Sequence, residues 1–196
     1  MKLILLFSFL FTLGCASTRS NPYLQLVSES EYDAIIESNT QKKQIYNGFM
    51  NILEVSATQI SSSVARAQID QNARLYQWNQ EQYSIERAKV ETDLTKRTEY
   101  FLSFFVPERK HDDLHKPSTK WKVFLDTGGR RYEGSVRKLK TLLAEVSAIY
   151  PHHTRWQTPY MVSFPVPASV IDSGEAKITL TGPVTSTTLE FNSVKN

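Results

Sequence analysis

The sequence predicts an α+β fold, in which a long helical segment of two packed helices precedes a small antiparallel β sheet or sandwich with one inserted helix. The first observation is that residues 28–106 contain no proline and one glycine, while apolar residues recur at steps of three and four, the period of a helix face. The second is that apolar and polar residues alternate from Trp121 onward, between turns rich in glycine and proline, which is typical of short strands.

The chain begins with a short apolar run. Lys2 is followed by Leu3 to Leu13, which is too short to cross a bilayer, because a spanning helix needs about 20 residues. Its length fits the central region of a secretory signal, roughly 7–15 residues. Small residues then surround the chain's one cysteine in Leu13-Gly14-Cys15-Ala16, and this motif resembles the lipobox of bacterial lipoproteins.

This resemblance implies a type II signal peptide, residues 1–14, whose removal makes Cys15 the first residue and the site of acylation. Residues 15–27 are then the lipidated cysteine and a polar tether broken by Pro22. Ala16, in place of aspartate, implies by the same resemblance an outer membrane with the folded part facing the periplasm. Acylation also accounts for the lone cysteine, because a secreted chain with one cysteine has no internal disulfide partner.

The helical segment is assigned to residues 28–106. Ser28 followed by Glu29 and Glu31 is a typical helix start, because serine caps free N–H groups and carboxylates favour the positive end of the helix dipole. The apolar face then carries Tyr46, Met50, Leu53, Ala57, Ile60, Val64 and Ala67, and a second series carries Ile69, Ala73, Tyr76, Tyr83, Val90 and Leu94.

Two structures fit the change of phase between these series. One is a single helix through residues 30–98, on the order of 100 Å long at 1.5 Å per residue. The other turns near Ser61–Ser63 into a hairpin of two helices, and we favour it because helices much longer than 25 residues usually belong to coiled coils or repeats. Asn47-Gly48 is a strand-hairpin signal. Its neighbours repeat with helical spacing, so it is assigned to the helix, at a cost of about 1 kcal/mol for the glycine.

Residues 107–120 form a charged linker, and residues 121–196 form the β-rich domain. The aromatic run from Tyr100 to Val106 is expected to pack the helices onto the core of that domain. Within the domain, residues 136–150 contain good helix formers and stop before Pro151, so we predict a helix there, with a long strand as the alternative. Strands are predicted at residues 121–125, 130–134, 159–166, 176–181 and 187–191.

Four histidines are the candidate metal ligands. His111 and His115 lie four apart in His-Asp-Asp-Leu-His, and His152-His153 would complete a site if the two loops met, because His and Asp bind zinc. The alternative is a solvated charged loop, since the glutamate of a metalloprotease helix is missing. We therefore assign no metal ligand and no catalytic residue.

Composition and motifs limit the functions available. The net charge of +3 lacks the strong basic stripe of a nucleic-acid binder, and no phosphate loop, dinucleotide fingerprint or nucleophile elbow occurs, so no cofactor is expected. The globular part resembles no named family.

We therefore expect a non-catalytic lipoprotein held to the membrane through acylated Cys15, which acts as a binding or scaffold module for an envelope protein, lipid or cell-wall component. One alternative is an envelope hydrolase or metal-dependent enzyme with a site around the histidines. A second alternative is a structural lipoprotein that oligomerises through a coiled coil.

Overall fold

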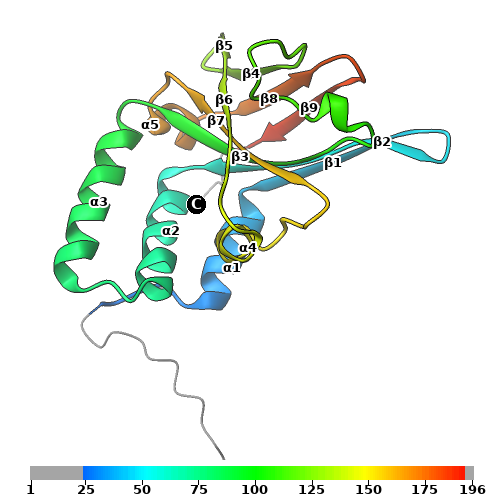
Figure 1. Ribbon diagram of the computed structural model, residues 1–196. Coiled ribbons are helices and arrows are strands. Elements are labelled where there is room, and N and C mark those ends of the chain that lie inside the picture. The colour runs from blue at the N-terminus through cyan, green and yellow to red at the C-terminus, as the bar shows by residue number, and fades with distance from the viewer. Residues whose placement is uncertain (1–23, 193–196) are drawn as a thin grey trace, which may run out of the picture.

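The computed structural model describes residues 24–192, which fold into five α-helices and two antiparallel sheets (Figure 1). The first sheet has the order β1-β2-β3-β7-β6, formed by Thr40–Asn47, Met50–Ile60, Thr98–Phe105, Thr158–Phe164 and Ser135–Lys138. The second sheet has the order β5-β4-β8-β9, formed by Arg130–Glu133, Lys122–Thr127, Ala176–Thr181 and Ser186–Phe191. The helical elements are α1 (Glu29–Ser38), α2 (Ser62–Leu75), α3 (Gln80–Leu94), the 3₁₀ turn η1 (Arg109–His111), α4 (Leu143–Ile149) and α5 (Ala168–Asp172).

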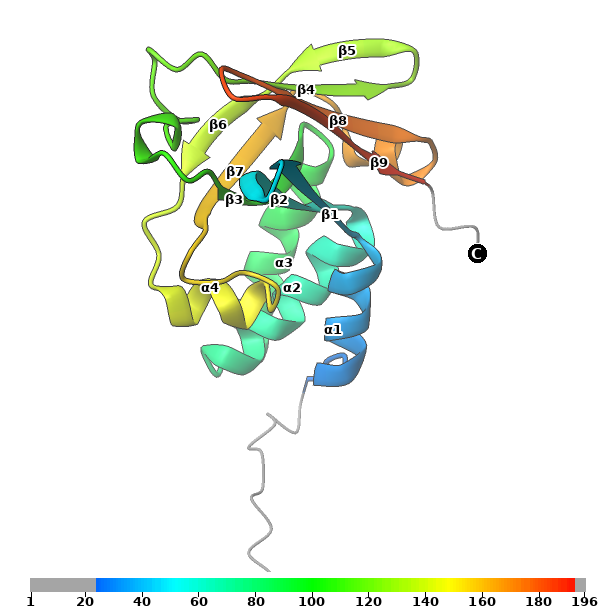
Figure 2. The same ribbon diagram turned by 90° about the vertical axis from the view of Figure 1, so that its right-hand side faces the viewer.

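The elements form three layers, with the first sheet in the middle (Figures 1 and 2). Helices α1, α2 and α4 cover one face of this sheet, and the second sheet covers the other. Along β3 the side chains alternate accordingly: Tyr100 and Leu102 are buried between the sheets, whereas Phe101 is buried under the helices. Both faces of the first sheet are therefore core, and a buried large apolar side chain contributes roughly 1.5–3 kcal/mol.

The predicted long helical segment is wrong, because most of its first half is a β hairpin. Strands β1 and β2 pair antiparallel from Thr40 opposite Thr58 to Asn47 opposite Met50. Asn47-Gly48 is the hairpin turn that the sequence signalled, with Gly48 at φ 59°, a conformation that glycine adopts without strain. The apolar steps of three and four in this part of the sequence do not mark a helix face.

The predicted pair of helices meeting at Ser61–Ser63 is also wrong, because α2 and α3 both lie within the second of those two predicted helices. Helices α2 and α3 are 14 and 15 residues long and pack on each other, but the turn between them follows Tyr76 rather than lying at Ser61–Ser63. Ser61 is instead the N-cap of α2, where its hydroxyl accepts the Val64 N–H. Helices of this length, paired within the chain, do not provide the extended helix that the coiled-coil alternative requires.

The second half of the chain follows the sequence more closely. The strands predicted at 121–125, 130–134, 159–166, 176–181 and 187–191 correspond to β4, β5, β7, β8 and β9. The helix predicted over 136–150 is confirmed only in its last half, since the first residues form β6 beside β7. The run from Tyr100 to Val106 is buried as expected but is itself the central strand β3, which pairs with both β2 and β7. The first sheet thus joins strands from both halves of the chain.

The linker at 107–120 is a loop held against the body. Asp112 accepts hydrogen bonds from the hydroxyls of Thr158 (2.6 Å) and Tyr160 (2.9 Å), and the His111 carbonyl accepts one from the Trp121 indole (2.7 Å). No helix among residues 24–192 is long and apolar enough to span a bilayer.

Candidate functional site

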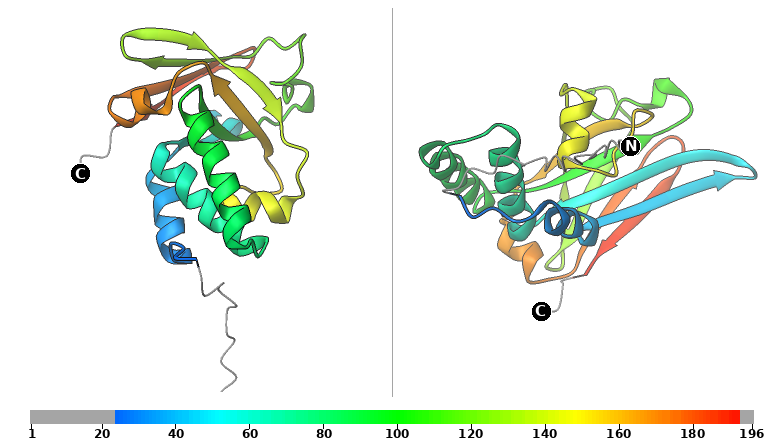
Figure 3. Two further views of the ribbon diagram at one scale, coloured as in Figure 1. Left: turned by 90° about the vertical axis from the view of Figure 1, so that its left-hand side faces the viewer. Right: turned by 90° about the horizontal axis from the view of Figure 1, so that it is seen from below.

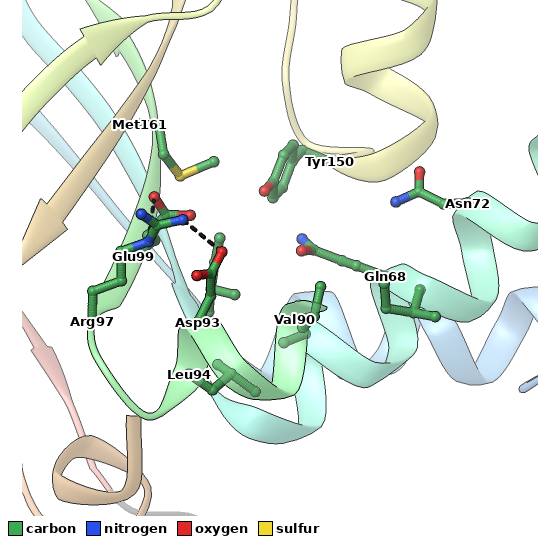
Figure 4. A pocket seen from close by; sticks show the side chains of 12 residues that line it. Gln68, Asn72, Val90, Asp93, Leu94, Arg97, Glu99, Tyr150 and Met161 are labelled. Carbon is green, nitrogen blue, oxygen red and sulfur yellow. Dashed lines mark hydrogen bonds and ion pairs between the residues drawn. The ribbon is translucent and has the colours of Figure 1, made fainter. Parts of the chain in front are cut away.

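A pocket of about 170 Å³ opens between α2, α3 and the helix-facing side of the first sheet (Figure 4). Its walls come from elements far apart in the sequence: two helices, the strands β2, β3 and β7, and the end of α4. The apolar lining consists of Ile60, Ala65, Ile69, Val90, Leu94 and Met161, and the polar lining consists of Gln68, Asn72, Asp93, Arg97, Glu99 and Tyr150.

The α2 wall follows from the helix period. Gln68 and Ile69 follow Ala65 by three and four residues, and Asn72 follows it by seven, so all four share one face of the helix and line the pocket together. The same helix buries Val64, Ala67 and other residues against α1 and the sheet, which fixes its position. The α2 wall is therefore a rigid side of the pocket.

Helix α3 is held more lightly. It starts with a capping box, in which Asn79 and Gln82 exchange side-chain and backbone hydrogen bonds, yet none of its residues is fully buried. It contacts the body through the Tyr83 hydroxyl, which donates to Asp70 (2.8 Å), and through half-buried apolar residues such as Val90 at the pocket. Elements with few buried contacts open at lower free energy than the core, so we expect α3 to be the wall of the pocket that moves most readily.

The side-chain amide of Gln68 lies at the wall of the pocket and is directed toward the Tyr150 phenol (Figure 4). Its Nε2 is buried and makes no hydrogen bond within the described part of the chain (Figure 4). Burial raises the pKa of the Tyr150 phenol, and a hydrogen-bonding contact from the Gln68 amide opposes that rise. This contact does not have the geometry of an ordinary hydrogen bond, so the Gln68 N–H is at best weakly paired. An unpaired buried donor costs roughly 1–3 kcal/mol and is uncommon in folded proteins.

Tyr150 is fixed by stacking. Its ring lies over Phe101 with centroids 3.6 Å apart and planes 3° from parallel. Because Phe101 belongs to the central strand β3, the phenol that borders the pocket is held by the sheet.

Charged groups stand at the rim of the pocket. Arg97 pairs with Asp93 at 2.7 Å and approaches Glu99 at 3.7 Å, as the dashed lines in Figure 4 show. Two carboxylates therefore flank one guanidinium, which leaves the rim with one net negative charge. A surface pair of this kind adds little stability, but its charge disfavours anionic ligands at the entrance.

A second polar cluster lies deeper, under the helices, and contains His153. Ser103 Oγ is 2.6 Å from His153 Nδ1 and donates to Gln157 Oε1 at 2.7 Å, and Gln157 Nε2 donates to Glu54 at 3.0 Å. The Thr154 backbone N–H also donates to Gln157 Oε1 (3.2 Å), so the amide orientation is fixed by its partners.

These bonds decide the proton positions in the Ser103–His153 pair. The single hydroxyl proton of Ser103 goes to the Gln157 oxygen, so the hydroxyl must accept from His153, which carries its proton on Nδ1. In a nucleophilic pair the hydroxyl donates to the imidazole instead. Ser103 is also fully buried, and burial lowers the pKa of His153. The cluster links β2, β3 and the turn after α4 as a satisfied buried network.

The four candidate histidines are not brought together. His152 and His153 pack edge-on against Phe101, on the helix side of the first sheet, whereas the His115 ring lies against Tyr160, whose side chain belongs to the core between the sheets. His111 lies in η1 before His115. Within residues 24–192 no group of three or more His, Cys, Asp or Glu side chains could hold a metal ion.

The remaining predicted site residue, Cys15, lies outside the described residues together with the rest of Leu13-Gly14-Cys15-Ala16. The residues that sequence reasoning missed are those of the pocket, above all Gln68 and Tyr150. A glutamine on the apolar face of α2 was the one available signal, because polar residues on such a face are usually paired or functional.

Comparison with known proteins gives no match: no family model, no curated protein and no solved structure is significantly similar to this chain.

Proposed function

We propose that this protein is a lipid-anchored, non-catalytic binding module of the bacterial envelope, and that its ligand is a small molecule held in the pocket between α2 and α3. The observation that carries the proposal is Gln68 Nε2, a buried donor at the wall of a cavity that makes no hydrogen bond of ordinary geometry. A ligand acceptor would complete this hydrogen bond, which gives the folded chain a reason to retain the polar group.

The size and lining of the pocket limit the ligand. An apolar cavity of about 150 Å³ holds one benzene molecule, so the 170 Å³ here suits a single ring or a short branched chain. The apolar walls favour an apolar body, and the Gln68 N–H requires a carbonyl, ether or similar acceptor. The net negative rim formed by Asp93, Arg97 and Glu99 favours a neutral or cationic ligand over an anion.

A non-catalytic function is supported by the chemistry around the histidines. The hydroxyl of Ser103 is buried and gives its proton to Gln157, so it is not activated by His153. The proposed lipid anchor is supported by the apolar run and by Leu13-Gly14-Cys15-Ala16, which resembles a lipobox. The folded body, with its pocket, would work at the surface of the membrane that holds Cys15.

Three probes of equal non-hydrogen atom count test the pocket. Acetophenone combines a ring with a neutral carbonyl, benzoate carries an anionic charge, and isopropylbenzene lacks an acceptor. We expect acetophenone to bind most tightly and the Gln68→Met variant to bind it about tenfold more weakly, the equivalent of one hydrogen bond of about 1.4 kcal/mol. Equal binding of the three probes, or an unchanged affinity in the variant, would count against Gln68 as the recognition group.

The anchor has its own test. Protein extracted from bacterial membranes is digested, and the mass of its N-terminal peptide is measured. We expect a peptide that begins at Cys15 and carries a diacylglyceryl group on its sulfur. A peptide that begins at Met1, or an unmodified Cys15, would remove the lipid-anchored part of the proposal while leaving the pocket untouched.

A further inference from the structure

The turn between α2 and α3 presents apolar and aromatic side chains to solvent. We name residues 75–78 the Tyr76 corner. Tyr76 is 57% exposed and Leu75 is 44% exposed, and the Tyr76 ring stacks on Trp78 with centroids 6.3 Å apart. Gln77, between the two rings, has a φ of 53° and so forms the tight reversal that puts them on the same side. Trp78 itself is partly buried, so the exposed part of the corner is Leu75 and Tyr76. Exposed apolar side chains gathered at one turn are typical of interaction sites.

The corner lies where the described chain begins. Residues 24–30 border the same surface hollow as Arg74, Leu75 and Gln77. The Val27 N–H donates to Asp70 of α2 (3.0 Å), and the Arg74 guanidinium donates to the Val27 carbonyl. Seen from below, this first segment runs across the ends of α3 and α2 into α1 (Figure 3). The N-terminal segment is therefore fastened to the last turns of α2, next to the corner.

The length of the preceding chain limits how far this surface can be from a bilayer. Nine residue steps separate Cys15 from Leu24, and a fully extended chain spans at most about 30 Å over that length. If Cys15 is embedded in a membrane, the face of the protein that carries Leu24 is the face held nearest to it. The Tyr76 corner is part of that face.

A second group of exposed apolar side chains serves as a comparison for the Tyr76 corner. Tyr46, Phe49 and Met50 sit at the tip of the β1–β2 hairpin, and Phe49 is fully exposed. That tip lies at the opposite end of the molecule from the Tyr76 corner in both Figure 1 and the right-hand view of Figure 3. Both groups are exposed, so exposure alone does not show which of them faces a membrane. Only the Tyr76 corner lies beside Leu24, from which the chain continues toward Cys15.

We propose that the Tyr76 corner rests in the interfacial layer of the bilayer that holds acylated Cys15, and this inference depends on the lipid anchor in the proposed function. Tyrosine and tryptophan favour the headgroup level, because their rings are apolar at one end and polar at the other. Acidic residues begin the two helices beside the corner, with Glu29 and Glu31 in α1 and Glu81 in α3. The surface thus suits zwitterionic headgroups rather than anionic ones.

The experiment uses the tryptophans of the protein as depth reporters. The lipidated full chain is reconstituted in vesicles of zwitterionic phosphatidylcholine, either plain or with brominated acyl chains that quench nearby tryptophans. Trp156→Phe keeps the partly buried Trp78 as the reporter in the corner, and the matched Trp78→Phe keeps the exposed Trp156. Both retain Trp121, which is buried between the sheets. A third variant carries Trp78→Phe, Trp156→Phe and Phe49→Trp, so that its reporter is at the tip of the β1–β2 hairpin.

We expect brominated lipid to reduce the emission of the Trp78 chain and to leave the Trp156 and Phe49→Trp chains unchanged. Adding Tyr76→Glu to the Trp78 chain should remove the quenching, because a charge at this level is poorly tolerated. Quenching at Phe49→Trp instead, or at none of the three, would overturn the inference. The mass of the Cys15 peptide is measured on the same samples, so an unanchored protein is recognised as a failure of the anchor and not of the corner.

Discussion

Replacing Gln68 by methionine should stabilise the ligand-free protein while weakening ligand binding. The side chains have similar length, but methionine lacks the buried N–H that makes no hydrogen bond of ordinary geometry. Leaving such a donor unpaired costs roughly 1–3 kcal/mol, and allowing for the loss of the amide's contact with Tyr150, we expect a net gain of about 1 kcal/mol. In a chain of this size that gain raises Tm by roughly 2–4 °C.

A second glutamine on the same helix provides the control. Gln71 Nε2 donates to the Ala148 carbonyl at 3.0 Å, and its oxygen accepts from Arg74. Gln71→Met leaves these partners unpaired and should destabilise the protein by roughly 1–3 kcal/mol. The two variants are compared by urea unfolding without ligand, with the slope m checked for constancy. If Gln68→Met lowers stability as much as Gln71→Met does, the Gln68 amide is paired in solution and the reasoning fails.

Three further outcomes are expected. Burial lowers the pKa of His152 from 6.5 to about 4, so the unfolded chain binds a proton at this residue more tightly than the folded chain does. The free energy of unfolding therefore falls as the pH drops from about 6.5 to about 4. Because the ring is partly exposed, we expect a loss of about 2 kcal/mol. His152→Gln should abolish most of this loss, unlike the exposed control His115→Gln. Hydrogen exchange should be at least about tenfold faster in α3 than in α2, and equal protection would mean that α3 is not a movable wall. Gly182→Ala should cost roughly 1–3 kcal/mol or more by urea unfolding, because a Cβ there would clash with the Trp121 ring, and a neutral result would show that the ring can shift.

The sequence indicated individual turns and short strands better than it indicated which segments pair with each other in the sheets. Period-two alternation identified β4, β8 and β9 because one face of each of these strands packs against a single core. It also identified β7, although that strand is buried on both faces, with Tyr160 and Val162 between the sheets and Met161 under the helices.

The same alternation is present in β2, where Leu53, Val55 and Ala57 alternate with polar residues. Leu53, Ala57 and Ile60 also fit steps of three and four, so this segment was assigned to a helix. Given that ambiguity, the Asn47-Gly48 turn signal was the more reliable guide.

The candidate site was beyond reach of sequence reasoning for a different reason. Gln68, Glu99, Tyr150 and Met161 lie in four elements, and they meet only because β3 pairs with β7 and α4 folds back over the sheet. No short motif joins them. The histidine pairs show the opposite problem. Their local spacing suggested a metal site, but the fold places His115 and His153 on opposite sides of the first sheet.

The most direct measurement on the central claim is a titration of the isotope-labelled full chain with acetophenone, followed through the side-chain NH₂ resonances of its glutamines. The account predicts that the Gln68 resonances shift and saturate, while those of Gln71, already bonded to Ala148, remain in place. Shifts spread over exposed glutamines with Gln68 unmoved would contradict it.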